Sequence, residues 1–196
     1  MLAQEFDRFF AAIEALGLRK VALHWQAARR HDVIPAWRDL DPAAIKLQLP
    51  IIWSWKYDRA ADRFKGRLAG EAINTIFGRS LRGRLMEEFF HGDVYRRMFA
   101  RHKRIVTEPA FYHGAGPVFH HEGRTGSGER IILPLAADGR NGDGLFGATV
   151  YELPATLDAL RVHDSLTEEV ESFFSISTTW CPGSMIPTSG AGPNFP

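Results

Sequence analysis

The sequence predicts an α/β fold of the α+β kind, in which helices cover one face of a five-stranded antiparallel sheet. Two observations lead to this prediction. Two segments, at about 51–57 and 63–69, place alternate residues on opposite faces with a period of two, and three further strand-like segments are separated by turns rich in Gly, Asn and Asp. An amphipathic helical segment, at about 93–107, lies between the first two strands and the last three, with short helices before it. Further helical segments flank this core on both sides.

Length and composition are typical of one folded domain with flanks. The chain has 196 residues, of which 45% are apolar, and a formal net charge of +1, so no overall field draws it to nucleic acid or to an anionic membrane. Its single cysteine, Cys181, excludes an internal disulfide and fits a reducing compartment. With no secretion-signal layout and no run near the roughly 20 apolar residues of a membrane span, we expect a cytoplasmic protein.

The N-terminal part, residues 1–40, is predicted to be a helical cap. Apolar residues from Leu2 to Leu16 recur at spacings of three and four, which indicates an amphipathic helix that Gly17 ends. A second helix follows at about 19–30. These helices either pack on the core or form a dimer contact.

The predicted core spans residues 41–153. Asp41 and Pro42 are typical of a helix start, so a short helix is expected there before Pro50. Strands at about 51–57 and 63–69 form a hairpin. Trp53 and Trp55 share one strand face, which makes them either core residues under the helices or an interaction patch on the outer face.

The second half of the core begins with the helix at 93–107, for which Asp93 is the expected cap. Its apolar arc contains Met98 and His102. Three strands then form a meander between about 110 and 152. Residues 154–180 are predicted to be a C-terminal helical flank with a helix at about 165–174, and residues 181–196 a disordered tail.

Several motifs occur in the order of one PAS subfamily, found mostly in alphaproteobacteria as a stand-alone domain. The chain resembles that subfamily over about 29–152, in WRDLDPAAIKLQLPIIW, FKGRLAGEAINTIFGRSLRGR and ERIILPLAADGRNGD. Arg38, Asp41 and Asp138 are its motif residues, as is Arg67. The resemblance implies a PAS-like sheet whose short helices wall a pocket. An arginine and an aspartate near that pocket could bind a ligand carboxylate or, as we expect, pair with each other.

Candidate pocket residues come from these short helices, the longer helix and the motif strands. They are Arg67, Ile73, Ile76, Phe77, Leu81, Met98, His102 and Leu133. The glycines at 70, 78 and 83 match no phosphate-binding motif and are expected to end short helices.

The candidate chemistry is limited. His102 lies where a haem-carrying PAS domain would place its iron ligand, although a hydrogen-bonded core histidine is the preferred interpretation. His120 and His121 would point to opposite faces of a strand, so no metal site is expected. Flavin–thiol photochemistry is not expected because Cys181 lies far from the pocket segments. No catalytic motif is present, and we do not expect an enzyme.

The expected function is that of a sensory or regulatory module. It would bind a small ligand or a protein partner without covalent chemistry and signal through a change of interface. The alternatives are a structural homodimerising adaptor with a filled pocket, whose outer sheet face and N-terminal helix form the dimer, or a haem-binding sensor using His102. The expected partners are a signalling protein and a second copy of the chain, with neither membrane nor nucleic acid.

Overall fold

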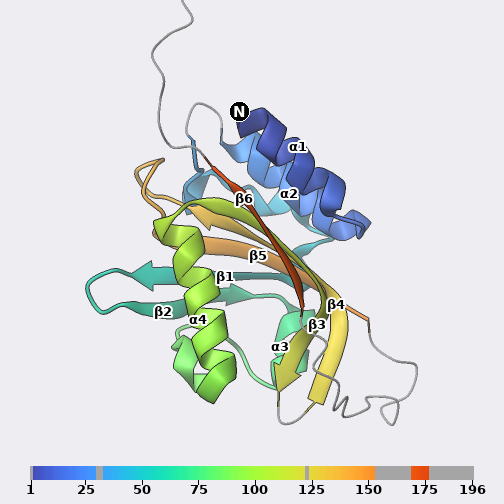
Figure 1. Cartoon of the computed structure of the whole chain (residues 1–196), viewed down its shortest axis with the longest axis vertical. Helices are drawn as coiled ribbons and strands as arrows, with labels where there is room; N and C mark the ends of the chain where they lie inside the picture. Colours follow the sequence, from blue (N-terminus) through green and yellow to red (C-terminus); the bar gives the residue numbers. More distant parts are fainter. Residues whose placement is uncertain (1, 30–32, 122–123, 153–168, 177–196) are drawn as a thin grey trace, which may run out of the picture.

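The computed structural model describes residues 2–29, 33–121, 124–152 and 169–176 of the chain. Its centre is a six-stranded antiparallel sheet with the order β2-β1-β5-β4-β3-β6 (Figure 1). The strands are β1 (Ile52–Asp58), β2 (Arg63–Ala69), β3 (Ala110–His121), β4 (Arg124–Leu135), β5 (Gly144–Tyr151) and β6 (Val170–Ser175). The predicted hairpin and meander are both confirmed, and the pairing of β1 with β5 joins them.

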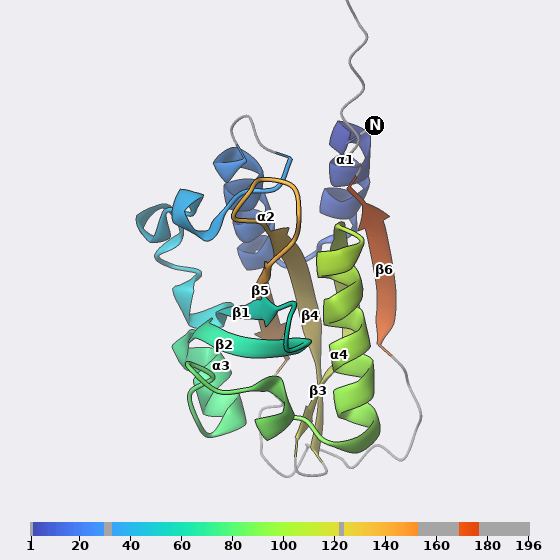
Figure 2. The same cartoon turned by 90° about the vertical axis from the view of Figure 1, so that its left-hand side faces the viewer.

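Helices cover both faces of this sheet. The α-helices are α1 (Leu2–Ala12), α2 (Leu16–Ala28), α3 (Glu71–Phe77) and α4 (Gly92–Thr107). Alternating strand residues show the division, because Phe111 packs in the cluster of α1 and α2 whereas its neighbour Tyr112 packs in the cluster of α3 and α4. The sheet face that the core helices are predicted to cover is therefore covered by α3 and α4, together called the α3–α4 roof here. Figure 2 shows α4 beside β3 and β4.

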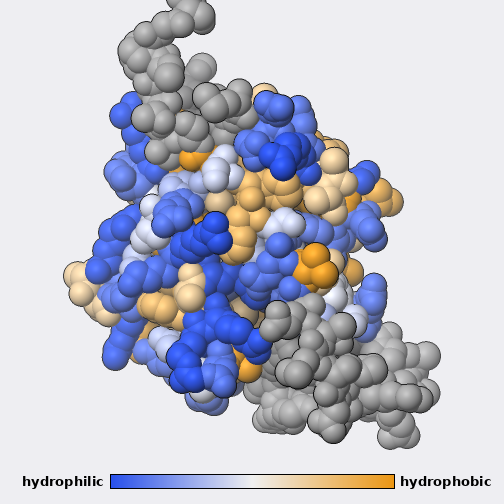
Figure 3. All heavy atoms as spheres, viewed as in Figure 1, coloured by the Kyte–Doolittle hydropathy of each residue, from blue (hydrophilic) through white to orange (hydrophobic). Residues whose placement is uncertain are grey.

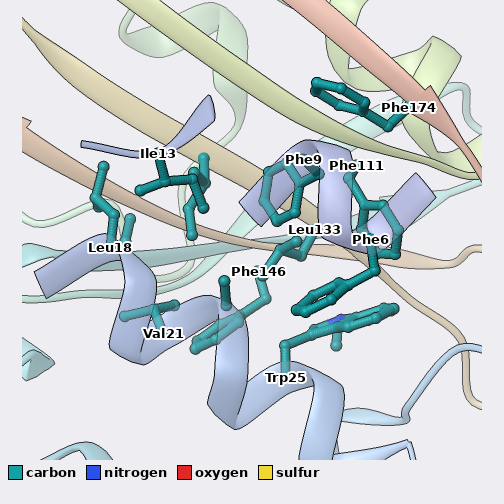
Figure 4. Packing of buried hydrophobic residues seen from close by; sticks show 14 of the residues in the cluster. Phe6, Phe9, Ile13, Leu18, Val21, Trp25, Phe111, Leu133, Phe146 and Phe174 are labelled. Atoms are coloured by element: carbon teal, nitrogen blue, oxygen red, sulfur yellow. The ribbon is translucent and has the colours of Figure 1, made fainter. Parts of the chain in front are cut away.

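The N-terminal helices pack on the sheet of their own chain, as one of the two sequence interpretations held. Figure 4 shows side chains from α1 and α2 directed at Phe111, Leu133 and Phe146 of the strands. The ring centroids of Phe9 and Phe111 lie 5.1 Å apart, and Trp25 donates from its indole nitrogen to the Pro134 carbonyl at 2.8 Å. The sheet face opposite the α3–α4 roof is thus covered.

Two predicted helix boundaries are wrong. Gly17 does not end the first helix; α1 ends at Ala12, and Gly17 lies inside α2. The turn between them is held by the Glu129 carboxylate, which accepts hydrogen bonds from the backbone N–H of Glu14 at 2.8 Å and Ala15 at 2.7 Å. This contact, distant in sequence, could not be found from local spacing. Asp93 is not the cap of α4 either, because the N-cap residue is His91.

The C-terminal helix predicted at 165–174 is wrong over its described part, where the chain forms β6 and adds a sixth strand to the sheet. Phe173 and Phe174 explain the outcome. Phe174 packs against Phe9 of α1, whereas Phe173 packs against Tyr112 on the other face. Consecutive residues reach opposite faces only in a strand, and β6 also satisfies the free edge of β3. Residues 154–168 of the expected flank and the tail at 181–196 lie outside the described residues.

The surface of α4 that faces away from the sheet is polar. Arg96, Arg97 and Arg104 are exposed on it, and Figure 3 shows hydrophilic side chains over this part of the molecule. His102, Ile105 and Val106 are buried on the opposite side of the helix, so the predicted amphipathic pattern is confirmed. Among the helices that the structure describes, none combines the length and the apolar character needed to cross a membrane.

Candidate functional site

A cavity lies between the sheet and the helices α3 and α4. Its enclosed volume is about 40 Å³, and the space counted out to its open mouth, solvent included, is about 490 Å³. The sheet contributes Trp53 and Trp55 from β1, Val118 from β3, Arg130 from β4 and Thr149 and Tyr151 from β5. The two tryptophans therefore face inward, as one sequence interpretation held.

The remaining wall comes from α3, α4 and the segment between them. It consists of Ile73, Phe77, Leu81, Phe90, Val94, Met98 and His102. Gly78 ends α3 with a φ of 65°, in the left-handed region that favours glycine, as its predicted helix-ending role requires. This sharp end lets the chain turn back so that Leu81 reaches the wall.

Five of the eight candidate pocket residues meet at the cavity, namely Ile73, Phe77, Leu81, Met98 and His102. The other three lie elsewhere. Leu133 belongs to the cluster beneath α1 and α2, because its position in β4 places it on the opposite face from Arg130. Arg67 stacks over the Trp37 ring at 4.3 Å, and Ile76 is half-buried on α3 away from the wall.

The motif residues hold local structure. Asp41 caps the 3-10 helix η2 (Pro42–Ile45) by accepting from the Ala43 N–H at 2.9 Å, which confirms the predicted helix start. Asp138 accepts backbone N–H groups in the turn between β4 and β5, and its hydrogen bonds, first that from Asn141, lower its pKa. Arg38 is exposed. The expected arginine–aspartate pairing of the motifs is not found within the described part of the chain.

His102 is fully buried in the wall. Its Nδ1 lies 2.7 Å from the Met98 carbonyl oxygen, so Nδ1 carries the proton and donates it. Its ring stacks on Trp53 at 5.5 Å, and Nε2 is buried with no hydrogen-bond partner. Burial, and next the charge of Arg101, lower the His102 pKa to about 3, so the imidazole is neutral at physiological pH.

This environment does not fit a haem ligand. An axial histidine must present its free nitrogen to the iron in an open, flat slot. The cavity that His102 lines has an enclosed volume of only about 40 Å³, which is too small for a porphyrin. The geometry is that of the core histidine that the sequence interpretation preferred. Nor do three or more His, Cys, Asp or Glu side chains gather into a metal-binding group among the described residues.

Sequence reasoning missed a buried ionic cluster beside the cavity. Arg130 Nε lies 2.9 Å from Glu169 Oε1, and Arg101 of α4 contacts both Glu169, at 2.8 Å, and Glu171 of β6. The hydroxyl of Tyr112 is buried nearby, and burial raises its pKa. A signal for Arg130 was present, because this charged residue shares a strand face with the buried Ile132. Glu169 carries no such signal, because the pattern at 165–174 predicts a helix.

The fold and this cavity define the class of protein. The antiparallel sheet, with helices on both faces and an aromatic-walled cavity between the sheet and α3–α4, is the α+β architecture of a small regulatory domain with helical flanks. The family model described as PAS domain matches residues 14–150, well over half of the chain. The chain belongs to the PAS domain family, and its sensory or regulatory class follows. No curated protein and no solved structure shows significant similarity to it.

Proposed function

We propose that this PAS domain binds a small, mainly apolar ligand without covalent chemistry in the cavity between the sheet and α3–α4. The cavity itself is the observation that carries the proposal. Aromatic and aliphatic side chains form most of its wall, and His102, Arg130, Thr149 and Tyr151 supply a few polar groups. Such a combination is typical of sites that bind small molecules and orient them through a few polar contacts.

The proposal is of a binding module, not an enzyme. A general base must accept a proton near the working pH, and a pKa of about 3 makes His102 a poor one at neutral pH. Arg67, a second candidate pocket residue, stacks on Trp37 away from the cavity. Both facts favour recognition over turnover.

Signalling would proceed through a protein partner when ligand binding shifts the position of α4 or of the sheet edge. A homodimer through a bare outer sheet face is disfavoured, because α1 and α2 of the same chain cover that face. A second copy would therefore meet the outward surfaces of the helices.

The proposal includes membership of the stand-alone alphaproteobacterial subfamily, which the order of the motifs suggests.

Native mass spectrometry of protein purified from cells under gentle conditions tests the cavity. The wild-type chain is expected to carry a non-covalent small-molecule adduct. The Val94→Trp variant places a larger side chain in the wall and is expected to lose that adduct. Leu47→Trp is the matched control, since Leu47 is 75% exposed and lies away from the cavity.

The outcome separates a sensor from the adaptor alternative. An adduct in the wild type and in Leu47→Trp, but not in Val94→Trp, supports ligand binding in this cavity. A bare wild-type mass together with a tight dimer would favour the adaptor. An adduct that Val94→Trp retains would place the ligand elsewhere.

A further inference from the structure

The buried ionic cluster joins the cavity to the C-terminal edge of the sheet. It contains two cations, Arg101 and Arg130, and two anions, Glu169 and Glu171. The side chains of Arg101, Arg130 and Glu169 are each 8% exposed or less. Charges enclosed to this degree are tolerated only while they are paired, so each arginine must keep a carboxylate.

Arg130 belongs both to the cavity wall and to the ionic cluster. It lines the cavity, where it is the only ionic side chain among the wall residues that the structure describes, and it forms the ion pair with Glu169. That pair is imperfect, because the Nε of Arg130 and the Oε1 of Glu169 approach without hydrogen-bond geometry. The Nη1 of Arg130 donates to the sulfur of Met98, at 3.8 Å, which is a weak acceptor.

We infer that the ligand of this cavity carries a carboxylate that takes the place of Glu169 on Arg130, and that this exchange loosens the start of β6. The inference rests on the proposed function and adds the chemical class of the ligand and the element that responds. A carboxylate in the cavity can accept two parallel N–H bonds from the guanidinium, which is the geometry that arginine offers best.

The charges balance after the exchange. The ligand neutralises Arg130, and Glu171 still neutralises Arg101. Neither buried arginine then requires Glu169 as its partner. A neutral ligand of the same shape cannot do this, because removing Glu169 would leave Arg130 buried and unpaired. The response is therefore selective for an anion.

The exchange acts on β6 because Glu169 directly precedes its first residue. Val170 pairs with Ala115 of β3. Strand β6 lies at the edge of the sheet, and β3 is the one strand with which it pairs. The side chain of Val170 is 71% exposed and contributes little packing. When Glu169 leaves the cluster, the first pairs of β6 lose their anchor.

Gly114 shows how closely Glu169 is seated. A Cβ atom at this position would lie 2.2 Å from Glu169 Oε1 and 2.6 Å from the Tyr112 hydroxyl. Gly114→Ala is therefore expected to push Glu169 out of the cluster. It reproduces the release of Glu169 from the start of β6, without the ligand's pairing with Arg130, by a route independent of the cavity.

Hydrogen exchange and calorimetry on the full chain test the inference with two matched pairs of probes, phenylacetate with phenylacetamide and hexanoate with hexanamide. In the wild type, the carboxylates are expected to bind more tightly than the amides and to speed amide exchange over 170–175. Gly114→Ala is expected to speed the same exchange without any probe. Glu169→Gln weakens the competing anion and is expected to tighten carboxylate binding about tenfold.

Glu171→Gln is the matched control. It removes an equal charge from Arg101, does not touch Arg130 and is expected to change the carboxylate-to-amide preference much less. Equal affinity for carboxylate and amide, or no change over 170–175 on carboxylate binding, overturns the inference while the cavity remains a ligand site. Failure of both carboxylates to bind the wild type and Glu169→Gln also overturns it. The Val94→Trp adduct experiment then decides the proposed function separately.

Discussion

Replacing His102 with Asn is expected to remove much of the acid sensitivity of the fold. In the folded chain the pKa of His102 is lowered to about 3, chiefly by burial. In the unfolded chain the ring regains its ordinary value of 6.5. Asn carries an amide donor in place of the Nδ1–H that bonds the Met98 carbonyl, but it does not titrate.

The sign and size follow from proton uptake. Between pH 6.5 and about pH 4, the unfolded chain binds a proton at His102 and the folded chain does not, so the wild type loses stability as the pH falls. Each pH unit over which only the unfolded state is protonated is worth about 1.4 kcal/mol. The loss attributable to His102 over this window is therefore about 3 kcal/mol.

Urea unfolding at a series of pH values measures this loss. The stability difference between wild type and His102→Asn is expected to shrink by about 3 kcal/mol from neutral pH to about pH 4, because other titrating groups act equally in both. His91→Asn, at an exposed position, is the matched control and should keep the wild-type pH profile. If wild type and His102→Asn lose stability in parallel, or if NMR shows His102 titrating near 6.5 in the folded chain, this reasoning is refuted.

Three further substitutions probe the packing around the site. Phe9→Ala removes a fully buried ring from the α1–sheet interface and is expected to cost about 3–5 kcal/mol in urea unfolding. Gly147→Ala would place a Cβ 2.3 Å from the Trp53 ring, so we expect a loss of about 2 kcal/mol and a changed near-UV circular dichroism. Glu129→Gln weakens the charged acceptor of the Ala15 N–H and is expected to cost about 1–2 kcal/mol, seen as a lower melting temperature.

Leu47→Ala serves as a control for these three, because an exposed side chain is expected to contribute less than about 0.5 kcal/mol. A loss at Phe9 no larger than at Leu47 would contradict the packing of α1 on the sheet. An unchanged near-UV spectrum in Gly147→Ala would contradict the close contact with Trp53. Wild-type stability in Glu129→Gln would contradict its role in the turn.

The sheet and its α3–α4 roof could be predicted because their signals are local. Period-two alternation marked β1 and β2, strand-like segments between glycine-rich turns marked β3 to β5, and the apolar arc of α4 placed Met98 and His102 on its inner side. Whether α1 and α2 pack on the core or form a dimer contact does not follow from the sequence, since an amphipathic helix does not specify its partner. The structure decides it through contacts such as that between Phe9 and Phe111.

The rest depended on contacts between distant segments. Residues 170–175 contain two adjacent phenylalanines that are compatible with a helix or a strand, and only the free edge of β3 selects the strand. The pairing of Arg130 with Glu169 follows from that choice, so the ionic cluster could not be found before β6 was known. Leu133 was wrongly predicted to line the cavity for a related reason. The sequence motif that contains Leu133 does not specify which residues of β4 face the cavity.

Electron density in a crystal of cell-purified protein tests the central claim most directly. Ligand binding in the cavity predicts density for a small molecule between Trp53 and Met98, with an acidic group beside Arg130. Density for water alone, or a cavity closed by its own side chains, would contradict it.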